Sequence, residues 1–338
     1  MKKVLSRLVP ILIVSWMVCV ANGCNRTVPQ ASTSQKDTSN QLYIEVSALG
    51  GLDYFYDHKL GLKLAARSLG VRTEYVGPAD YDMAAMITAF EQALAKKPNG
   101  IVVVGFEDSL CAVVDKAVAA GIPVVTVDAD LANSRRVAFV GTGNFAAGDT
   151  GGAKLAALIG GKGKVALLTK PGQPNLEERI AGYKSALAKH PGIELVQIAD
   201  TQSDNNVAAQ AAAALLQKFP DLAGMGCVEA AGGAGAAIAV KEAGKAGAVK
   251  IVAMDRGNEV LQHIQDGVIA ATVVQNTALM PFYAVQILYN LANFPAPIST
   301  DNAKAGITGA PAVIDTGVVV VDAANCRYFM RPPGAAVL

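Results

Sequence analysis

Alternating strand and helix patterns run along this chain from residue 42 onward, and they restrict the fold more than any other feature. Short apolar runs such as 101–104 alternate with segments of helical apolar spacing such as 83–94. One series ends near residue 140, and a second begins at residue 164. Repeated strand–helix units form parallel sheets covered by helices. We therefore predict an α/β fold with two similar lobes, followed by a helix at 279–291 and a late strand at 313–321.

Length and charge agree with two domains and argue against a nucleic-acid partner. The chain has 338 residues, of which 52% are hydrophobic, so two sizeable cores are expected. The formal net charge is +1, from 29 basic and 28 acidic residues. No basic run follows residue 26, so no nucleic-acid surface is expected.

Several predicted strands stop at a polar side chain. Asp128 follows the apolar run of G-I-P-V-V-T-V-D, Asp255 closes I-V-A-M-D, and Gln275 ends I-A-A-T-V-V-Q. In open α/β sheets, ligands bind at the carboxyl ends of the strands. These three residues are therefore candidates for holding a small polar molecule, although an aspartate there is also a common helix N-cap or turn residue.

The first 24 residues are expected to be a signal peptide. Lys2, Lys3 and Arg7 precede an apolar run at 9–20, and Ala21-Asn22-Gly23 stands before Cys24. This ending resembles the lipobox of bacterial lipoproteins, in which Cys24 would carry the lipid and anchor the protein to the membrane. Ordinary cleavage with an unmodified Cys24 is the alternative. The apolar run is too short for a spanning helix. Residues 25–41 are polar and predict a flexible tether.

No metal site or cofactor is expected. The cysteines that follow Cys24, which are Cys111, Cys227 and Cys326, have no CxxC spacing and favour free thiols, with one disulfide left open. The three histidines lack HxxxH spacing. The glycines that begin at Gly141 have the wrong spacing for a dinucleotide fingerprint, and no G-x-S-x-G elbow occurs.

Five motifs occur in an order that resembles a known family. They are G-I-P-V-V-T-V-D, G-G-K-G-K-V-A-L-L, E-E-R-I-A-G-Y-K-S-A-L, I-V-A-M-D and D-G-V-I-A-A-T-V-V-Q. Together they resemble the ribose-binding-protein group of type 1 periplasmic binding proteins, over about residues 42–322. The resemblance implies a hinge crossed near 140–144, 275 and 310–316. It implies an N-terminal lobe of 42–141 plus 276–310 and a C-terminal lobe of 142–275 plus 311–338.

The resemblance also implies the residues of the site. Aligned with the family's ligand-binding positions, beside the strand-end residues above, are Arg179 and the aromatic pair Tyr54 and Phe55. The alternatives are a solvated helix charge for Arg179 and core packing for the two aromatics. Glu229 aligns with a family asparagine. Asp130, two residues after Asp128, is an additional carboxylate near that strand end. This acidic set favours a polyol, cyclitol or amino-sugar.

The expected function is that of an extracytoplasmic substrate-binding lipoprotein. It would capture a small sugar or sugar-like polyol, act as a monomer in the periplasm or on the outer face of the cytoplasmic membrane, and deliver the ligand to an ABC transporter permease. A ligand-sensing receptor module for chemotaxis or signalling is the alternative. A sugar hydrolase using paired carboxylates stays open in principle, but we expect a binding protein without enzymatic activity.

Overall fold

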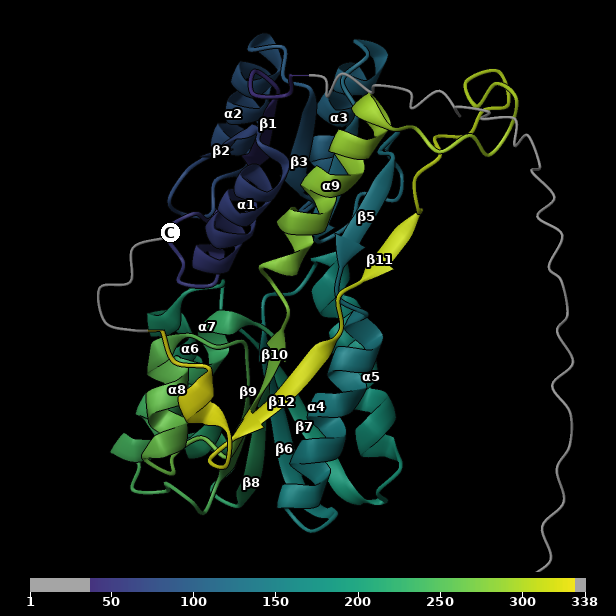
Figure 1. The fold of residues 1–338 in the computed structure, drawn as a ribbon. Coiled ribbons are helices and arrows are strands. Elements are labelled where there is room, and N and C mark those ends of the chain that lie inside the picture. Colours follow the sequence, from purple (N-terminus) through teal and green to yellow (C-terminus); the bar gives the residue numbers. More distant parts are fainter. Residues whose placement is uncertain (1–36, 332–338) are drawn as a thin grey trace, which may run out of the picture. The chain divides into compact units, whose positions relative to one another are not determined.

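Six parallel strands form the first of two sheets. In the computed structural model, which describes residues 37–331, the strand order is β11-β5-β4-β3-β1-β2. These strands are β1 (Leu42–Val46), β2 (Arg72–Val76), β3 (Gly100–Val104), β4 (Val124–Asp128), β5 (Ala138–Gly141) and β11 (Val313–Asp315). The sheet is covered by α1 (Phe55–Leu69), α2 (Met83–Ala95), α3 (Cys111–Ala119) and α9 (Leu279–Asn293), and together these elements are the first lobe (Figure 1).

The second lobe repeats this plan with one antiparallel edge. Its strand order is β12-β10-β9-β8-β6-β7, and β12 runs antiparallel to β10. The strands are β6 (Lys162–Thr169), β7 (Gly192–Asp200), β8 (Leu222–Cys227), β9 (Lys250–Met254), β10 (Ala271–Gln275) and β12 (Val318–Asp322). The helices are α4 (Asn144–Leu158), α5 (Pro174–Ala188), α6 (Asn205–Lys218), α7 (Ala230–Glu242) and α8 (Asn258–Gln265). The predicted fold class is confirmed.

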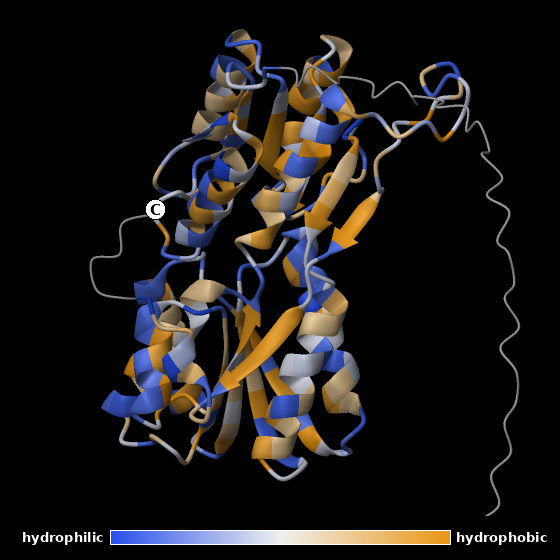
Figure 2. Cartoon of the chain, viewed as in Figure 1, coloured by the Kyte–Doolittle hydropathy of each residue, from blue (hydrophilic) through white to orange (hydrophobic). Residues whose placement is uncertain are grey.

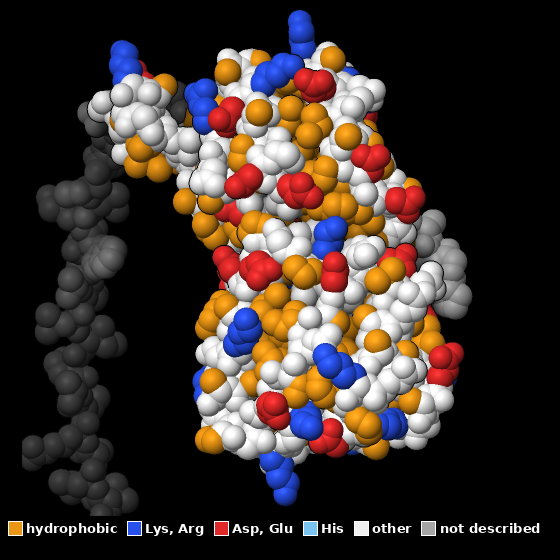
Figure 3. All heavy atoms as spheres, turned by 180° about the vertical axis from the view of Figure 1, so that it is seen from behind, with side chains coloured by type: hydrophobic (Ala, Val, Ile, Leu, Met, Phe, Trp, Pro, Cys, Tyr) orange, Lys and Arg blue, Asp and Glu red, His pale blue; other side chains and the backbone are white. Residues whose placement is uncertain are grey.

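Burial explains why the central strands have continuous apolar sequences. Every residue of β3 and of β4 is buried, because helices cover both faces of the sheet. Figure 2 shows this as hydrophobic strands inside each lobe and helices with hydrophilic faces outside. In the view from behind, acidic and basic side chains are interspersed over the surface (Figure 3). None of the helices within residues 37–331 has the length and apolar character that crossing a bilayer requires.

The late strand predicted at 313–321 is two strands in two different sheets. β11 pairs with β5 in the first lobe, whereas β12 pairs with β10 in the second. Thr316 and Gly317 lie between them, and Gly317 has a φ of 71°, which glycine adopts without strain. Residues 313–315 therefore belong to the sheet of the first lobe, whereas the prediction assigned all of 311–338 to the C-terminal lobe. The chain passes between lobes here, after β5 and after β10.

Helix α4 was not predicted from the sequence. Gly148, Gly151 and Gly152 lower the helix propensity of this segment. The structure shows why they are there: α4 packs closely on α5, and a Cβ at Gly148 would lie 2.0 Å from the backbone oxygen of Arg179. Close approach of two backbones thus replaces the usual apolar helix pattern.

The predicted signal peptide, lipobox and most of the tether lie outside the described residues, as do residues 332–338. Of the cysteines within residues 37–331, Cys111, Cys227 and Cys326 are free thiols. Cys227 and Cys326 are buried.

Candidate functional site

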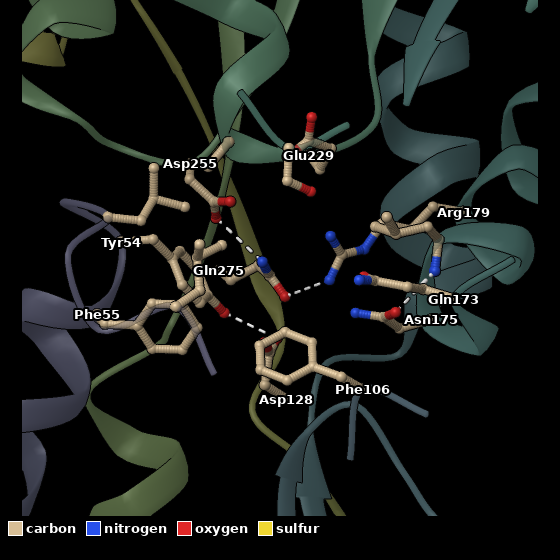
Figure 4. Close-up of a pocket in the computed structure, with 15 residues that line it drawn as sticks. Tyr54, Phe55, Phe106, Asp128, Gln173, Asn175, Arg179, Glu229, Asp255 and Gln275 are labelled. Atoms are coloured by element: carbon tan, nitrogen blue, oxygen red, sulfur yellow. Dashed lines mark hydrogen bonds between the residues drawn. The ribbon is translucent and has the colours of Figure 1, made fainter. Parts of the chain in front are cut away.

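A pocket lies between the lobes, where the carboxyl ends of the two sheets face each other. Strand order reverses beside the first strand of each lobe, as β2-β1-β3 and as β7-β6-β8. Ligands of open α/β sheets bind at such reversal points. The pocket is lined by Leu49, Leu52, Tyr54, Phe55, Phe106, Asp128, Gln173, Asn175, Leu176, Arg179, Ser203, Glu229, Ala230, Asp255 and Gln275 (Figure 4). Seven of the eight predicted site residues are among them.

Each lobe places an aspartate at a strand end in a left-handed backbone conformation. Asp128 ends β4 with a φ of 63°, and Asp255 follows β9 with a φ of 67°. This left-handed conformation is uncommon for a residue other than glycine, and such residues concentrate at functional sites. Both side chains are buried and line the pocket from opposite lobes. Their equivalent positions make the site nearly symmetric between the two sheets.

On the first lobe, Asp128 is held by Tyr54. The Tyr54 hydroxyl donates a hydrogen bond of 2.8 Å to Oδ1 of Asp128. Tyr54 immediately precedes α1, and the Phe55 ring packs edge-on against it with centroids 5.0 Å apart. The structure therefore gives the aromatic pair both positions: Phe55 belongs to the core, Tyr54 packs against it, and both line the pocket, while their contact with a ligand stays a prediction.

On the second lobe, three polar side chains form a continuous chain of hydrogen bonds. Arg179 Nη2 donates to Oε1 of Gln275 at 2.6 Å, and Gln275 Nε2 donates to Oδ1 of Asp255 at 3.0 Å (Figure 4). Arg179 also donates from Nε to Asn144 at 2.8 Å. Because Gln275 ends β10, where the chain crosses to the first lobe, this chain links the pocket to the hinge.

Burial shifts the ionisation of the acidic groups. Removal from water raises the pKa of Asp255 to about 7, although the Arg179 guanidinium and the Gln275 amide oppose the shift. Burial also raises the pKa of Glu229, against the stabilising hydrogen bond from Thr201. The Tyr54 pKa is raised well above its ordinary value by burial and by the Asp128 and Asp255 charges, so its hydroxyl stays a donor.

Glu229 lines the pocket and also caps a helix. It is the N-cap of α7, and its Oε2 accepts from the backbone N–H of Ala231 at 3.3 Å. Its Oε1 accepts a 2.6 Å hydrogen bond from Thr201. These bonds fix the carboxylate at the wall of the pocket, where it can accept from a further donor.

Asp130 does not reach the pocket. Its carboxylate accepts from Thr126 at 2.7 Å and from the backbone N–H of Leu131 at 2.8 Å, and it forms an ion pair with Arg136. Because the backbone turns sharply at Asp128, the side chain of Asp130 points toward Thr126 in β4 and not toward the pocket. The prediction that Asp130 belongs to the same site therefore needs correction: its carboxylate stabilises the loop after β4.

Of the lining residues that were not predicted from the sequence, three carry an aromatic ring or a side-chain amide. Phe106 follows β3, and its ring lies 6.2 Å from that of Phe55. Gln173 and Asn175 follow β6, and Gln173 Nε2 donates to the Tyr81 hydroxyl of the first lobe at 3.3 Å. The same strand-end rule that selected Asp128 would have found Phe106, two residues after I-V-V-V.

The arrangement suits a polyhydroxylated ligand. Carboxylates, an amide and a guanidinium supply donors and acceptors, while Tyr54, Phe55 and Phe106 supply flat apolar faces. Within residues 37–331, no group of three or more His, Cys, Asp or Glu side chains is arranged to hold a metal ion. The site therefore offers recognition groups for hydroxyls and C–H faces.

We expect the affinity for such a ligand to fall at acidic pH. Ligand hydroxyls would hydrogen-bond to the ionised Asp255, whose pKa in the free protein is about 7. Binding would then lower that pKa and release a proton. A decrease from pH 8 to pH 5.5 should weaken binding by roughly tenfold or more. Titration calorimetry in two buffers of different ionisation enthalpy measures the proton release.

The Asp255→Asn variant is the control for this pH dependence. It should bind more weakly at pH 8 and lose most of the slope below pH 7. The sign for stability is opposite to that of an ordinary carboxylate. Between the ordinary aspartate pKa of 3.8 and the raised pKa of about 7, the folded state keeps a proton that the unfolded state has lost, so this group's contribution to stability falls as the pH rises. An unchanged slope in the variant would contradict the assignment.

Comparisons with known proteins agree on one family. A model described as a periplasmic binding protein domain matches residues 46–296. The D-allose-binding periplasmic protein of Escherichia coli is 30% identical over 236 residues, covering 67% of this chain and 76% of that protein. An arabinose-binding protein from Geobacillus stearothermophilus is 34% identical with a TM-score of 0.76, covering 86% of this chain and all of that one. An ABC transporter solute-binding protein from Burkholderia graminis, solved in complex with D-arabinose, is 29% identical with a TM-score of 0.78, and the match covers 88% of this chain and all of that one.

Proposed function

Because the chain belongs to the periplasmic binding protein family, as a ribose-binding-protein-like type 1 member, we propose that it captures a small sugar or sugar-like polyol between its two lobes. The observation that carries the proposal is the meeting of Asp128, Asp255, Arg179 and Gln275 in one buried pocket with aromatic faces beside them. The similar proteins described above are named for D-allose and arabinose, which have the same mixture of hydroxyls and C–H faces. They are binding proteins, which supports capture without chemical conversion.

We propose a ligand richer in donors than a simple pentose. Asp128, Glu229 and Asp255 contribute three carboxylates to the pocket, against one guanidinium from Arg179. Carboxylates only accept hydrogen bonds when ionised. A polyol, a cyclitol or an amino-sugar supplies the additional donors, and a protonated amine would also balance the charge.

A thermal-shift screen of the purified chain tests ligand capture. A ligand that binds only the folded state raises the melting temperature, by an amount that grows with its concentration over the dissociation constant. The screen covers pentoses, hexoses, polyols and amino-sugars, and small-angle scattering follows on any hit. We expect a lower radius of gyration at saturation, since contacts from both lobes favour the closed state. No hit in any class would contradict the proposed function.

We propose that the captured ligand is delivered to the permease of an ABC importer. Support comes from the Burkholderia relative, which is named as an ABC transporter solute-binding protein. A receptor module for chemotaxis or signalling is the second candidate, because the two lobes, once closed on the ligand, can present the same surface to a sensor protein. Deleting the gene separates the two: uptake of the labelled ligand would be lost in the first case, and only the behavioural or transcriptional response in the second.

We propose that the protein is tethered outside the cytoplasmic membrane through Cys24, as the N-terminal sequence predicts. Cys24→Ser should then move the protein from the detergent phase to the aqueous phase in a partitioning experiment, because one acyl-bearing residue is lost. The matched control is Cys111→Ser, in the folded body, which should not change the partitioning. Equal partitioning of the parent and Cys24→Ser would refute lipidation.

A further inference from the structure

Four charged side chains bridge the two lobes beside the pocket. In the first lobe, Asp53 precedes α1 and Asp57 lies in its first turn, while Arg256 and Arg331 come from the second lobe. We call these four residues the interlobe cluster. In Figure 1 the start of α1 and helix α8 lie on the left, whereas the crossing between β11 and β12 lies on the right. The cluster thus joins the lobes on the side away from that crossing.

The contacts within the cluster are direct and charge-assisted. Arg256 binds the Asp57 carboxylate with both Nε and Nη2, at 2.9 Å and 2.6 Å. Arg331 reaches the same carboxylate from Nη2 at 3.0 Å and Asp53 from Nη1 at 2.5 Å. A guanidinium that holds a carboxylate with two nitrogens fixes both distance and orientation. Asp57 is therefore the shared partner of two arginines from the opposite lobe.

Burial distinguishes the Asp57 pairs from an ordinary surface ion pair, whereas the side chain of Asp53 is 54% exposed. The side chains of Asp57 and Arg331 are only 5% and 8% exposed. Exposed ion pairs contribute little because water and salt screen them, whereas buried pairs with good geometry are coupled more strongly. Two carboxylates face two guanidiniums, so the charges balance. Separation of the lobes would leave four charged groups to be solvated apart.

Arg331 is firmly attached to the second lobe although it lies near the end of the chain. Its backbone N–H donates to Oδ1 of Asn258 at 3.0 Å, and its carbonyl accepts from Nδ2 of the same residue at 3.2 Å. Arg256 Nη1 donates to the Phe329 carbonyl at 3.1 Å. The guanidinium of Arg331 also lies 4.6 Å from the ring centroid of Tyr56 in the first lobe. These contacts fix the direction in which Arg331 reaches across.

The cluster is adjacent in sequence to the binding residues of both lobes. Arg256 directly follows Asp255, whose backbone conformation is left-handed. Asp57 lies in the first turn of α1, directly after Tyr54, Phe55 and Tyr56. The ion pair between Arg256 and Asp57 therefore connects the segment that carries Asp255 with the segment that carries Tyr54 and Phe55. Formation of the cluster and completion of the pocket require the same approach of the lobes.

We propose that Asp57, Arg256 and Arg331 are positioning residues that shift the lobes toward the closed arrangement before a ligand arrives. This inference rests on the proposed function, because its effect on affinity presumes that a ligand binds between the lobes. The apparent dissociation constant equals the intrinsic one divided by the fraction of closed protein. Loss of the cluster lowers that fraction and weakens binding without removal of any group that lines the pocket.

The experiment compares the full chain with Arg331→Gln and Asp57→Asn, neither of which alters a lining residue. Small-angle scattering without sugar should give both variants a larger radius of gyration than the parent. Calorimetry with D-ribose, D-allose, arabinose and xylitol as separate probes should show affinities about tenfold weaker for whichever probe binds. Arg331→Lys, which keeps the charge, should recover part of both effects.

Arg136→Gln is the matched control, because Arg136 and Asp130 form a partly buried pair within one lobe. It should leave the radius of gyration and the affinity at parental values. Parental values for Arg331→Gln in both measurements, or equal changes in Arg136→Gln, would overturn the cluster's role. If no probe binds the parent while the scattering changes appear, the closing role of the cluster stands, and the proposed function is decided by the wider ligand screen described above.

Discussion

Replacement of Asp128 or Asp255 by alanine is expected to weaken sugar binding by about a hundredfold or more. Each buried carboxylate can accept hydrogen bonds from two ligand hydroxyls, and a bond to a charged group contributes roughly 1.5–3 kcal/mol. Every 1.4 kcal/mol changes the dissociation constant about tenfold. Tyr54→Ala should cost only about tenfold, since stacking on one ring adds about 0.5–1.5 kcal/mol beyond its buried area.

Calorimetry is the appropriate measurement, because the single tryptophan, Trp16, lies in the predicted signal peptide. The chain offers a matched control in Asp130→Ala. Asp130 lies in the loop after Asp128 but does not line the pocket, so the variant should keep its affinity and lose stability because Arg136 would be left without its partner. Affinities within threefold of the parent for both Asp128→Ala and Asp255→Ala would place the site elsewhere. The proposed roles of all the strand-end residues would then fail together.

Gly148→Ala is expected to lower the free energy of unfolding by about 1–3 kcal/mol and to weaken ligand binding strongly. Propensity alone would make alanine better than glycine in a helix by about 1 kcal/mol. The added methyl, however, would lie 2.0 Å from the Arg179 backbone oxygen, whereas real Cβ contacts stay beyond 3.0 Å. Helix α5 must then move away from α4 and carry Arg179 out of hydrogen-bonding distance of Gln275. Overpacking of this kind commonly costs 1–3 kcal/mol.

Denaturant unfolding and calorimetry measure the two effects of Gly148→Ala separately. Ala146→Gly, at an exposed position two residues earlier in α4, calibrates the propensity term and should cost about 1 kcal/mol with unchanged affinity. If Gly148→Ala is instead more stable than the parent, the two helices have room to separate. The close contact would then have no part in positioning Arg179.

The sequence predicts the sheets well because buried parallel strands have continuous apolar runs and end at polar residues. Asp128, Asp255 and Gln275 were found by that rule alone, and the pocket brings them together. Arg179 needed the family resemblance, because a charge on a helix gives no local sign that it points inward. The ligand-binding roles of these residues stay predictions until the variants are measured.

The failures have local physical causes. Asp130 looked equivalent to Asp128, but a left-handed residue between two ordinary ones reverses the direction of the side chains that follow, and no pattern of residue types reveals that φ. Helix α4 was missed because its contact with α5 depends on glycines, which lower helix propensity and leave few large apolar residues to mark a helical pattern. The split between β11 and β12 depends on Thr316 and Gly317, within a run of β-branched residues that suits one long strand.

The three crossings between the lobes have a consequence for synthesis of the chain. Neither lobe is a continuous segment, because the first needs α9 and β11 and the second needs β12. Until α9 has been made, the side of the first sheet that it covers over β3, β4 and β5 lacks its apolar partner. A ribosome that reads from the N-terminus therefore produces both halves in an unfinished form. The body can complete its cores only when the last strands emerge, so both lobes finish folding after nearly the whole chain has been made.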